Sequence, residues 1–118
     1  MGLLNCDGLL RLLDAAQFNH DVVANNLANL NTPGYRTQRV RFARELEDLL
    51  DETGHLRPGK EIETELWRPM FRDVGADGND VKLEREIVQL NKNGIRMRLY
   101  LAAVKSRVQR LRAAIEGR

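Results

Sequence analysis

The fold is decided by residues 83–115, which read LEREIVQLNKNGIRMRLYLAAVKSRVQRLRAAI. Positions spaced alternately four and three residues apart run through this stretch, and all but one are apolar: Leu83, Ile87, Leu90, Gly94, Met97, Leu101, Val104, Val108, Leu111 and Ile115. This spacing places the side chains in one narrow stripe along a helix. It predicts a helix of about 33 residues, roughly 50 Å long.

Gly94 is the one position of this stripe without a side chain. Glycine costs a helix about 1 kcal/mol relative to alanine, whereas each buried apolar side chain of the stripe contributes roughly 1.5–3 kcal/mol. The helix is therefore predicted to continue through Gly94, which marks a close helix approach or a bend. Asn79 or Asp80 is predicted to cap the helix start.

A second stripe with the same spacing lies near the N-terminus: Leu9, Leu13, Ala16, His20, Val23, Leu27 and Leu30. It predicts a helix of about 22 residues that reaches back to Cys6 and is roughly 33 Å long. Pro33 lacks an amide hydrogen and forces Thr32 out of the helical region. Gly34 follows, so the helix is predicted to stop at a turn.

The segment between the two stripes shows no sustained period. Residues 36–44 fit either an extended piece or a lead-in to a helix. Apolar residues at 42, 46, 49 and 50 predict a short amphipathic helix that ends near Gly54. Residues 55–79 are punctuated by Pro and Gly and are predicted to be a loop with one or two short strands.

These elements predict a mainly α fold with an antiparallel coiled-coil pair of long terminal helices and an irregular middle that holds a short helix or short strands. The 118 residues form one domain, with a helix and turn over 1–35, the middle over 36–79 and the heptad helix over 80–118. The longer helix overhangs its partner by about 11 residues. Because an apolar stripe cannot stay in water, the overhang predicts self-association or assembly with similar subunits.

Charge is distributed unevenly along the chain. The segment from Glu45 to Glu65 is net −6, and the segment from Lys92 to Arg118 is net +7. This asymmetry predicts charge complementarity between neighbouring molecules, or a basic surface for an anionic partner. A small basic coiled-coil protein that binds nucleic acid is therefore the alternative reading.

The residues exclude several other classes. A single cysteine cannot form an internal disulfide. The sequence contains no run of 18 apolar residues, so no membrane-spanning helix is predicted. The N-terminus lacks the basic and apolar regions of a cleavable signal peptide. No catalytic constellation, metal site or cofactor is predicted: the single serine, Ser106, is mid-helix, His20 is expected to be a structural residue of the stripe, and Asp77–Asp80 reads as a tight turn rather than a calcium loop.

Four asparagines at positions 25, 26, 29 and 31 crowd the end of the first helix. Asparagine is a poor helix former because its side chain competes for backbone hydrogen bonds. Two interpretations stay open at this point. The asparagines fix register with neighbouring chains through polar contacts, or they only mark a frayed helix end.

The stretch from Val23 to Tyr35, VANNLANLNTPGY, closely resembles the N-terminal signature of bacterial flagellar rod, hook and hook-associated proteins. The residues that carry the resemblance are Asn25, Asn26, Asn29, Thr32, Pro33, Gly34 and Tyr35. The run DGNDVKLERE over 77–86, followed by Asn93 and a heptad helix, is similar to proximal rod proteins of the FlgB type.

The resemblance implies a structural subunit, not an enzyme, whose terminal helices stack into the tube of the flagellar rod. It implies a periplasmic place at the base of the rod, after export by the flagellar type III apparatus without a cleavable signal. The implied partners are copies of itself, other rod proteins, and the FliE adaptor with the export gate, without nucleic acid and without stable membrane insertion. The residues predicted to pack between subunits are Leu13, Val23, Leu27, Leu30, Leu90, Met97, Leu101, Val104, Val108 and Leu111.

Overall fold

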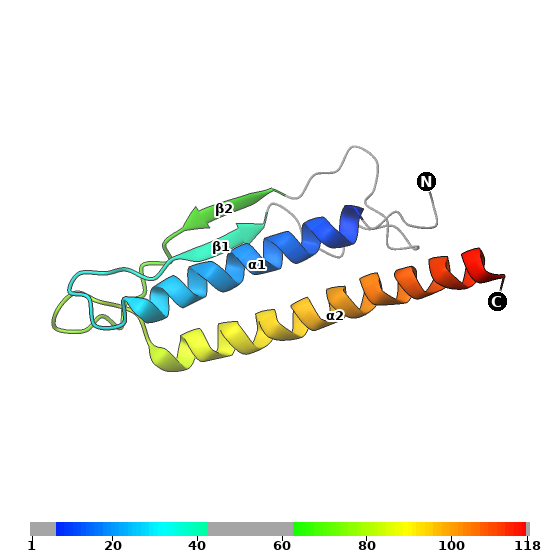
Figure 1. Cartoon of the computed structure of the whole chain (residues 1–118). Coiled ribbons are helices and arrows are strands. Elements are labelled where there is room, and N and C mark those ends of the chain that lie inside the picture. Colours follow the sequence, from blue (N-terminus) through cyan, green and yellow to red (C-terminus); the bar gives the residue numbers. More distant parts are fainter. Residues whose placement is uncertain (1–6, 43–62, 118) are drawn as a thin grey trace.

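The computed structural model describes residues 7–42 and 63–117. Their elements, in chain order, are helix α1 (Asp7–Ala28), strand β1 (Arg39–Phe42), strand β2 (Thr64–Trp67) and helix α2 (Leu83–Glu116). The predicted mainly helical class is confirmed (Figure 1). The helix predicted to end near Gly54, together with Cys6 and His55, lies outside the described residues.

The two helices lie side by side and run in opposite directions (Figure 1). The side-chain amides of Asn19 and Asn93 are joined by a hydrogen bond of 3.0 Å, and that of Asn26 donates to Glu86 at 2.6 Å. The helices are therefore antiparallel: as residue numbers rise along α1, the numbers of the facing residues on α2 fall. The same register places Asp7, where α1 begins, level with about Lys105.

Helix α2 has 34 residues and α1 has 22, so the C-terminal part of α2 continues past the start of α1 (Figure 1). We call this part, Lys105–Glu116, the overhang. It spans roughly 18 Å of helix. Helix α2 ends where Gly117 takes a left-handed conformation, at a φ of 72°.

The middle of the chain forms an antiparallel two-stranded ribbon, with Arg39 opposite Trp67 and Phe42 opposite Thr64. The sequence allowed an extended piece or a helix lead-in over residues 36–44, and the described part of this range, 36–42, holds the extended strand β1. The guanidinium of Arg41 lies 4.2 Å from the ring centroid of Trp67, a cation–π contact across the two strands. The ribbon lies beside α1 (Figure 1).

The line of closest contact between the helices differs from the predicted stripes by one residue. On α1 the buried positions include Leu12, Asn19 and Asn26, each one residue before a predicted stripe position. On α2 they are Glu86 and Asn93, again one residue before. One residue is 100° of rotation on a helix, so half of the predicted apolar stripe lies beside the contact line rather than on it. The buried apolar residues are Leu9, Leu12, Ala15, Ala16, Val22, Val23 and Val81.

Two local expectations about α2 are corrected. A Cβ placed on Gly94 meets no other atom of the described residues within 4 Å, so Gly94 makes no close helix approach to the described part of the chain. The residue at the N-cap position is Lys82, which makes no side-chain capping hydrogen bond. Asn79 and Asp80 are both buried and hold other groups instead.

Candidate assembly interface

The contact between α1 and α2 is polar at its centre. Asn93 accepts a hydrogen bond from Asn19 and donates at 2.7 Å to the carbonyl oxygen of Ala16. All three groups are buried, and each bond therefore satisfies a group that would be costly to leave unpaired. Such directional bonds specify one register between the helices, whereas apolar side chains alone tolerate sliding.

Asn26 is fully buried and uses its side-chain amide completely. Its Nδ2 donates to the Gln38 carbonyl oxygen at 2.8 Å and to Glu86 Oε1 at 2.6 Å. Its Oδ1 accepts from the Gln38 backbone N–H at 3.0 Å and from the Tyr35 hydroxyl at 3.1 Å. Asn26 therefore binds the start of the ribbon as a neighbouring strand would, and it also binds α2.

Glu86 brings a buried negative charge to the same place. Its two carboxylate oxygens accept hydrogen bonds from both terminal nitrogens of Arg39, at 2.7 and 2.6 Å. The pairing is bidentate, the strongest geometry for an arginine and a carboxylate. Arg39 belongs to β1, so this ion pair fixes the ribbon to α2.

Asp80 forms a second buried carboxylate centre. It accepts from the Thr37 backbone N–H at 2.6 Å and hydroxyl at 2.8 Å, and from the Phe71 N–H at 3.2 Å. Arg36 Nε lies 3.3 Å away and contributes charge. Burial by itself would raise the pKa of Asp80, but these hydrogen bonds and the charge outweigh it, so the pKa lies below its usual value.

We call Asn26, Gln38, Arg39, Glu86, Thr37 and Asp80 the polar joint. It lies at the end of the molecule where α1 stops and α2 starts, and it connects both helices to the ribbon. The crowded asparagines at the end of α1 predicted either contacts with neighbouring chains or a frayed helix end. For Asn26 the structure shows contacts within the chain instead. Glu86 and Asn93 were not predicted as contact residues, although Asn19 and Asn26, like Glu86 and Asn93, are polar pairs seven residues apart. Asp80 was predicted as a helix cap and not as the centre of these contacts.

The other residues of the signature shape the end of α1. Asn25 donates to the Tyr35 hydroxyl at 3.0 Å, and Thr32 Oγ1 donates to Asn29 Oδ1 at 3.0 Å. Gly34 has a φ of 76°, which non-glycine residues rarely adopt. Its N–H donates to the carbonyl of Asp77 at 2.9 Å. The exposed Pro33 stops the helix, as its chemistry predicts.

Asn79 completes the end of α1 from far along the chain. Its Nδ2 lies 2.9, 3.1 and 2.8 Å from the carbonyl oxygens of Asn29, Leu30 and Thr32. Carbonyl groups just past a helix have no partner within the helix and need one from elsewhere. Asp77–Asp80, predicted to be a tight turn, thus serves as a clamp on the first helix.

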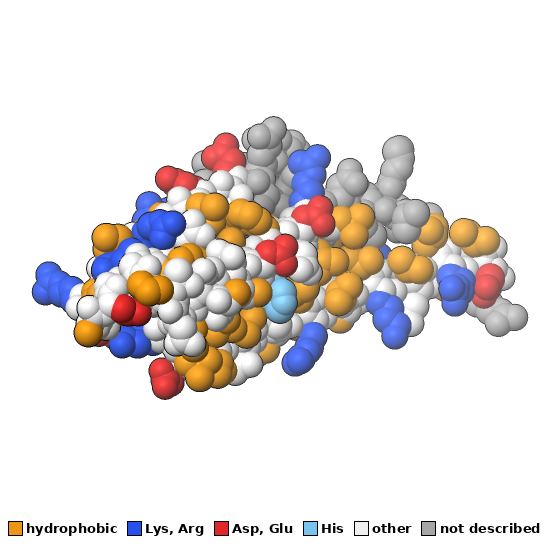
Figure 2. Space-filling view, turned by 60° about the vertical axis from the view of Figure 1, so that its left-hand side comes forward, with side chains coloured by type: hydrophobic (Ala, Val, Ile, Leu, Met, Phe, Trp, Pro, Cys, Tyr) orange, Lys and Arg blue, Asp and Glu red, His pale blue; other side chains and the backbone are white. Residues whose placement is uncertain are grey.

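A face of the helix pair carries apolar side chains without a partner in the described residues. We define this open face by Leu13 and Leu27 of α1 and by Ile87, Leu101 and Val108 of α2. Leu13, Leu27 and Ile87 each lie one residue after a contact-line position, and Leu101 and Val108 continue the row of Ile87 at heptad spacing. Helix geometry therefore puts both rows on the same side of the pair. The exposed fractions of Ile87, Leu101 and Val108 are 44%, 51% and 40%. Figure 2 shows apolar side chains continuing toward the tapering end of the molecule.

The predicted packing residues divide between buried and accessible positions. Val23 is fully buried in the single chain, and Leu101 and Val108 are exposed. The remaining seven are half-buried: Leu13, Leu27, Leu30, Leu90, Met97, Val104 and Leu111. His20 is half-buried too, between Leu13 and Leu27 on the open face. The exposed fraction rises to 76% for Ile115 in the overhang.

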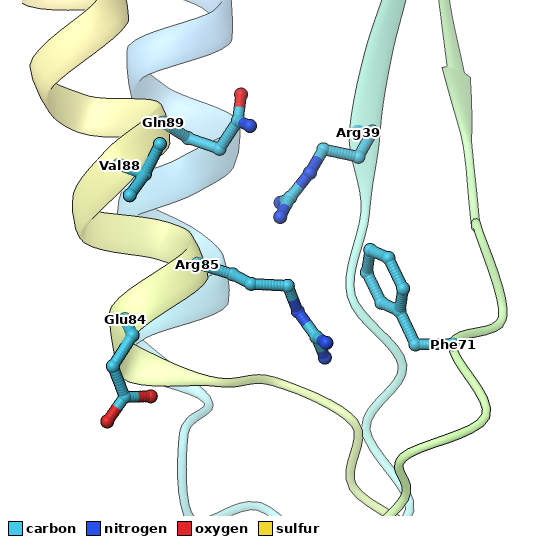
Figure 3. Close-up of a pocket in the computed structure, with 6 residues that line it drawn as sticks. All are labelled: Arg39, Phe71, Glu84, Arg85, Val88 and Gln89. Atoms are coloured by element: carbon cyan, nitrogen blue, oxygen red, sulfur yellow. The ribbon is translucent and has the colours of Figure 1, made fainter.

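A pocket of about 400 Å³ lies between the ribbon and the start of α2 (Figure 3). Phe71 forms one wall, with the guanidinium of Arg85 3.9 Å from its ring centroid. Arg85 also donates to Asp73 at 2.7 Å, which lowers the pKa of that carboxyl, and to the Asp80 carbonyl oxygen at 2.8 Å. Both arginines that line the pocket are thus engaged in ion pairs, Arg39 with Glu86 and Arg85 with Asp73.

The part of the chain that the structure describes shows neither a metal-binding cluster nor a membrane-spanning helix. Residues 7–42 and 63–117 hold no cluster of three or more His, Cys, Asp or Glu that could bind a metal ion. Within the same ranges, neither helix has an apolar stretch long enough to cross a bilayer.

Comparison with known proteins agrees with this geometry. Residues 13–36, which include the end of α1 and its turn, match the family described as flagella basal body rod protein. The FlgB rod protein of Aquifex aeolicus is 30% identical over 102 residues, covering 84% of this chain and 82% of that protein. The FlgB protein of Salmonella typhimurium is 26% identical over 113 residues, covering 82% of both.

A rod protein of another type matches a shorter part. The FlgG protein of Buchnera aphidicola is 38% identical over 79 residues, which are 67% of this chain but 28% of FlgG. The alignments with the FlgB relatives cover most of the length of those proteins and most of this chain. The chain therefore belongs to the flagellar basal body rod proteins, a family of structural components of the flagellum, and within it to the FlgB type.

Proposed function

We propose that this chain is a subunit of the proximal rod. Through its terminal helices it assembles with copies of itself and with other rod proteins into a tubular drive shaft, which transmits torque and surrounds the export channel. It acts there as one domain, in the periplasmic space, beside the FliE adaptor and the export gate.

The observation that carries this proposal is the open face together with the overhang. Apolar side chains exposed along a whole helix are unfavourable in water, and contiguous apolar patches of this kind mark protein interaction sites. A second helix laid along Ile87, Leu101 and Val108 covers them. Gly94 leaves room at the centre of this row, so a neighbouring backbone can approach closely there.

The polar joint supports the mechanical part of the proposal. A subunit that transmits torque must resist sliding and rotation of its helices against each other. Buried hydrogen bonds and a bidentate ion pair at one end of the helix pair supply this resistance because each fixes a single register.

Leu101→Asp tests the proposal. A carboxylate in the middle of the open face cannot be buried unpaired at low cost, so we expect normal expression, loss of rod assembly and loss of motility. Gln109→Asp adds the same charge at an exposed polar position of α2 and serves as the control, with assembly retained. Motile cells with normal amounts of Leu101→Asp in their rods would refute the proposal.

A further inference from the structure

The outer surfaces of the helix pair, which face away from the contact line, carry opposite charges. On α1, Asp14 and Asp21 lie two residues after the buried Leu12 and Asn19. Two residues rotate the side chain by about 200°, so both carboxylates point away from α2. Leu10 and Phe18 are exposed beside them. We call Leu10, Asp14, Phe18 and Asp21 the acidic face.

The outer surface of α2 has the opposite character. Val88 and Ile95 lie two residues after the buried Glu86 and Asn93, so they point away from α1. Lys92, Arg96 and Leu99 are exposed beside them. We call Val88, Lys92, Ile95, Arg96 and Leu99 the basic face.

The charged groups of both faces are available. Among the described residues, no ion pair engages Asp14, Asp21, Lys92 or Arg96; Asp21 only accepts a hydrogen bond from Gln17, at 3.0 Å. The apolar side chains between them are strongly exposed, to 56% for Ile95 and 63% for Leu99. Each face thus combines accessible charge with apolar side chains that no described residue covers. Asp14 and Asp21 outnumber the exposed Arg11 on the outer side of α1, and Lys92 and Arg96 outnumber the exposed Glu84 on that of α2.

We propose that the acidic face of one copy packs against the basic face of a second copy. The apolar side chains then cover one another, and Asp14 and Asp21 meet Lys92 and Arg96. The two faces match in kind: an apolar and a charged residue alternate over about three turns, or roughly 16 Å, on each helix. A second copy is the occupant because both complementary faces are present on the same chain.

This contact has a definite geometry. The two faces lie on opposite sides of one molecule, so the contact joins unlike surfaces and leaves one free face at each end of a stack. Contacts between unlike surfaces close into rings or extend into open helical arrays. The contact therefore allows assemblies of more than two subunits, as rings or as open arrays, and it is separate from the open face on which the proposed function rests. This inference shares with that proposal only the premise that copies associate.

Charge reversal in purified full-length protein tests the contact. In the variant Asp14→Lys/Asp21→Lys both outer faces are positive, and in Lys92→Glu/Arg96→Glu both are negative. Each variant alone is expected to raise the dissociation constant of self-association at least about tenfold at low salt, because like charges oppose each other across the contact. Sedimentation velocity then gives the mass of one chain, 13.5 kDa.

An equimolar mixture of the two variants is the decisive sample. Each positive copy can now bind negative neighbours on both sides, so we expect association to return to within about threefold of wild type. It should weaken again at 1 M salt, where the screening length falls to about 3 Å. The control Glu63→Lys/Glu65→Lys changes the net charge as Asp14→Lys/Asp21→Lys does, but on exposed residues away from both faces. It should associate like wild type.

Three results would overturn the inference: a wild-type chain that stays monomeric at every concentration tested at low salt, single variants that associate like wild type, or a mixture that stays monomeric. Circular dichroism of each variant verifies that α1 and α2 are formed. None of these results bears on Leu101→Asp in cells, so the failure of this contact and the failure of the proposed rod function are distinguishable.

Discussion

The two ends of this molecule differ in whether their side chains find partners within the described residues. At the polar joint, buried carboxylates and amides have partners within the same chain, as for Asn26 and Glu86. In the overhang, Val108 and Ile115 are exposed and the described residues offer them no cover. The polar groups of the first end are paired within the chain, whereas the second end leaves apolar side chains for the neighbouring subunits that we propose. The contacts that stabilise the single chain and the surface proposed for assembly thus lie on different parts of the same long helix.

The difference between the two ends should be reduced most strongly when the buried charge at the polar joint is removed. Glu86→Ala removes the carboxylate partner of Arg39 and one of the two acceptors of the Asn26 amide, and breaking a buried ion pair of this kind typically costs about 3–5 kcal/mol. We expect this loss in the free energy of unfolding measured with urea. Glu84→Ala, on the same turn but exposed, is the control and should change stability by less than about 0.5 kcal/mol. Equal effects of the two variants would show that the joint contributes nothing special.

Acid should weaken the joint through Asp80. Its pKa is lowered in the folded chain, so the unfolded chain takes up the proton first as pH falls. The stabilisation is therefore complete above the unfolded pKa of about 3.9 and is lost as pH falls through the lower folded value. Unfolding free energies measured between pH 6 and pH 2 should show this loss.

The variant Asp80→Asn isolates this effect. It should cost about 1–3 kcal/mol at pH 6 because an acceptor of the buried Thr37 and Phe71 groups becomes weaker, and it should remove part of the acid dependence. A variant with the full wild-type acid dependence would assign the effect to other carboxylates.

The overhang should show the smallest effect on the isolated chain. Ile115→Ser removes an apolar side chain that is already 76% exposed, so the unfolding free energy should change by no more than about 0.5 kcal/mol. Incorporation into rods, measured by immunoblot of purified basal bodies, should nevertheless fall. A large loss of stability in the monomer would show that Ile115 is covered within the chain, and the comparison would then fail.

Much of the helical frame was predictable from the sequence. Apolar spacing predicted both long helices, Pro33 and Gly34 predicted the stop, and unequal helix lengths predicted the overhang. The line of contact was not predictable from apolar spacing, because its centre is occupied by Asn19, Asn26, Glu86 and Asn93. A search for apolar periodicity passes over these polar residues and finds the row one position further on.

The contact of Asn79 with the end of α1 and the pairing of β1 with β2 could not be predicted from the sequence, for another reason. Asn79 looks like a helix cap by its position before α2, and only the fold brings it to the end of α1. Pairing of β1 with β2 depends on contacts between residues 22 to 28 positions apart in the chain, which local patterns do not encode. The assembly residues proposed on the open face stay predictions.

The clamp by Asn79 also sets the order in which the chain can mature. Its three carbonyl partners lie 47 to 50 positions earlier in the sequence. A polypeptide that emerges N-terminus first exposes Asn29, Leu30 and Thr32 long before residue 79 arrives, so its leading helix frays at that end. Closing so long a loop carries an entropic cost. The end of α1 therefore gains these three hydrogen bonds only after residue 79 has joined the chain.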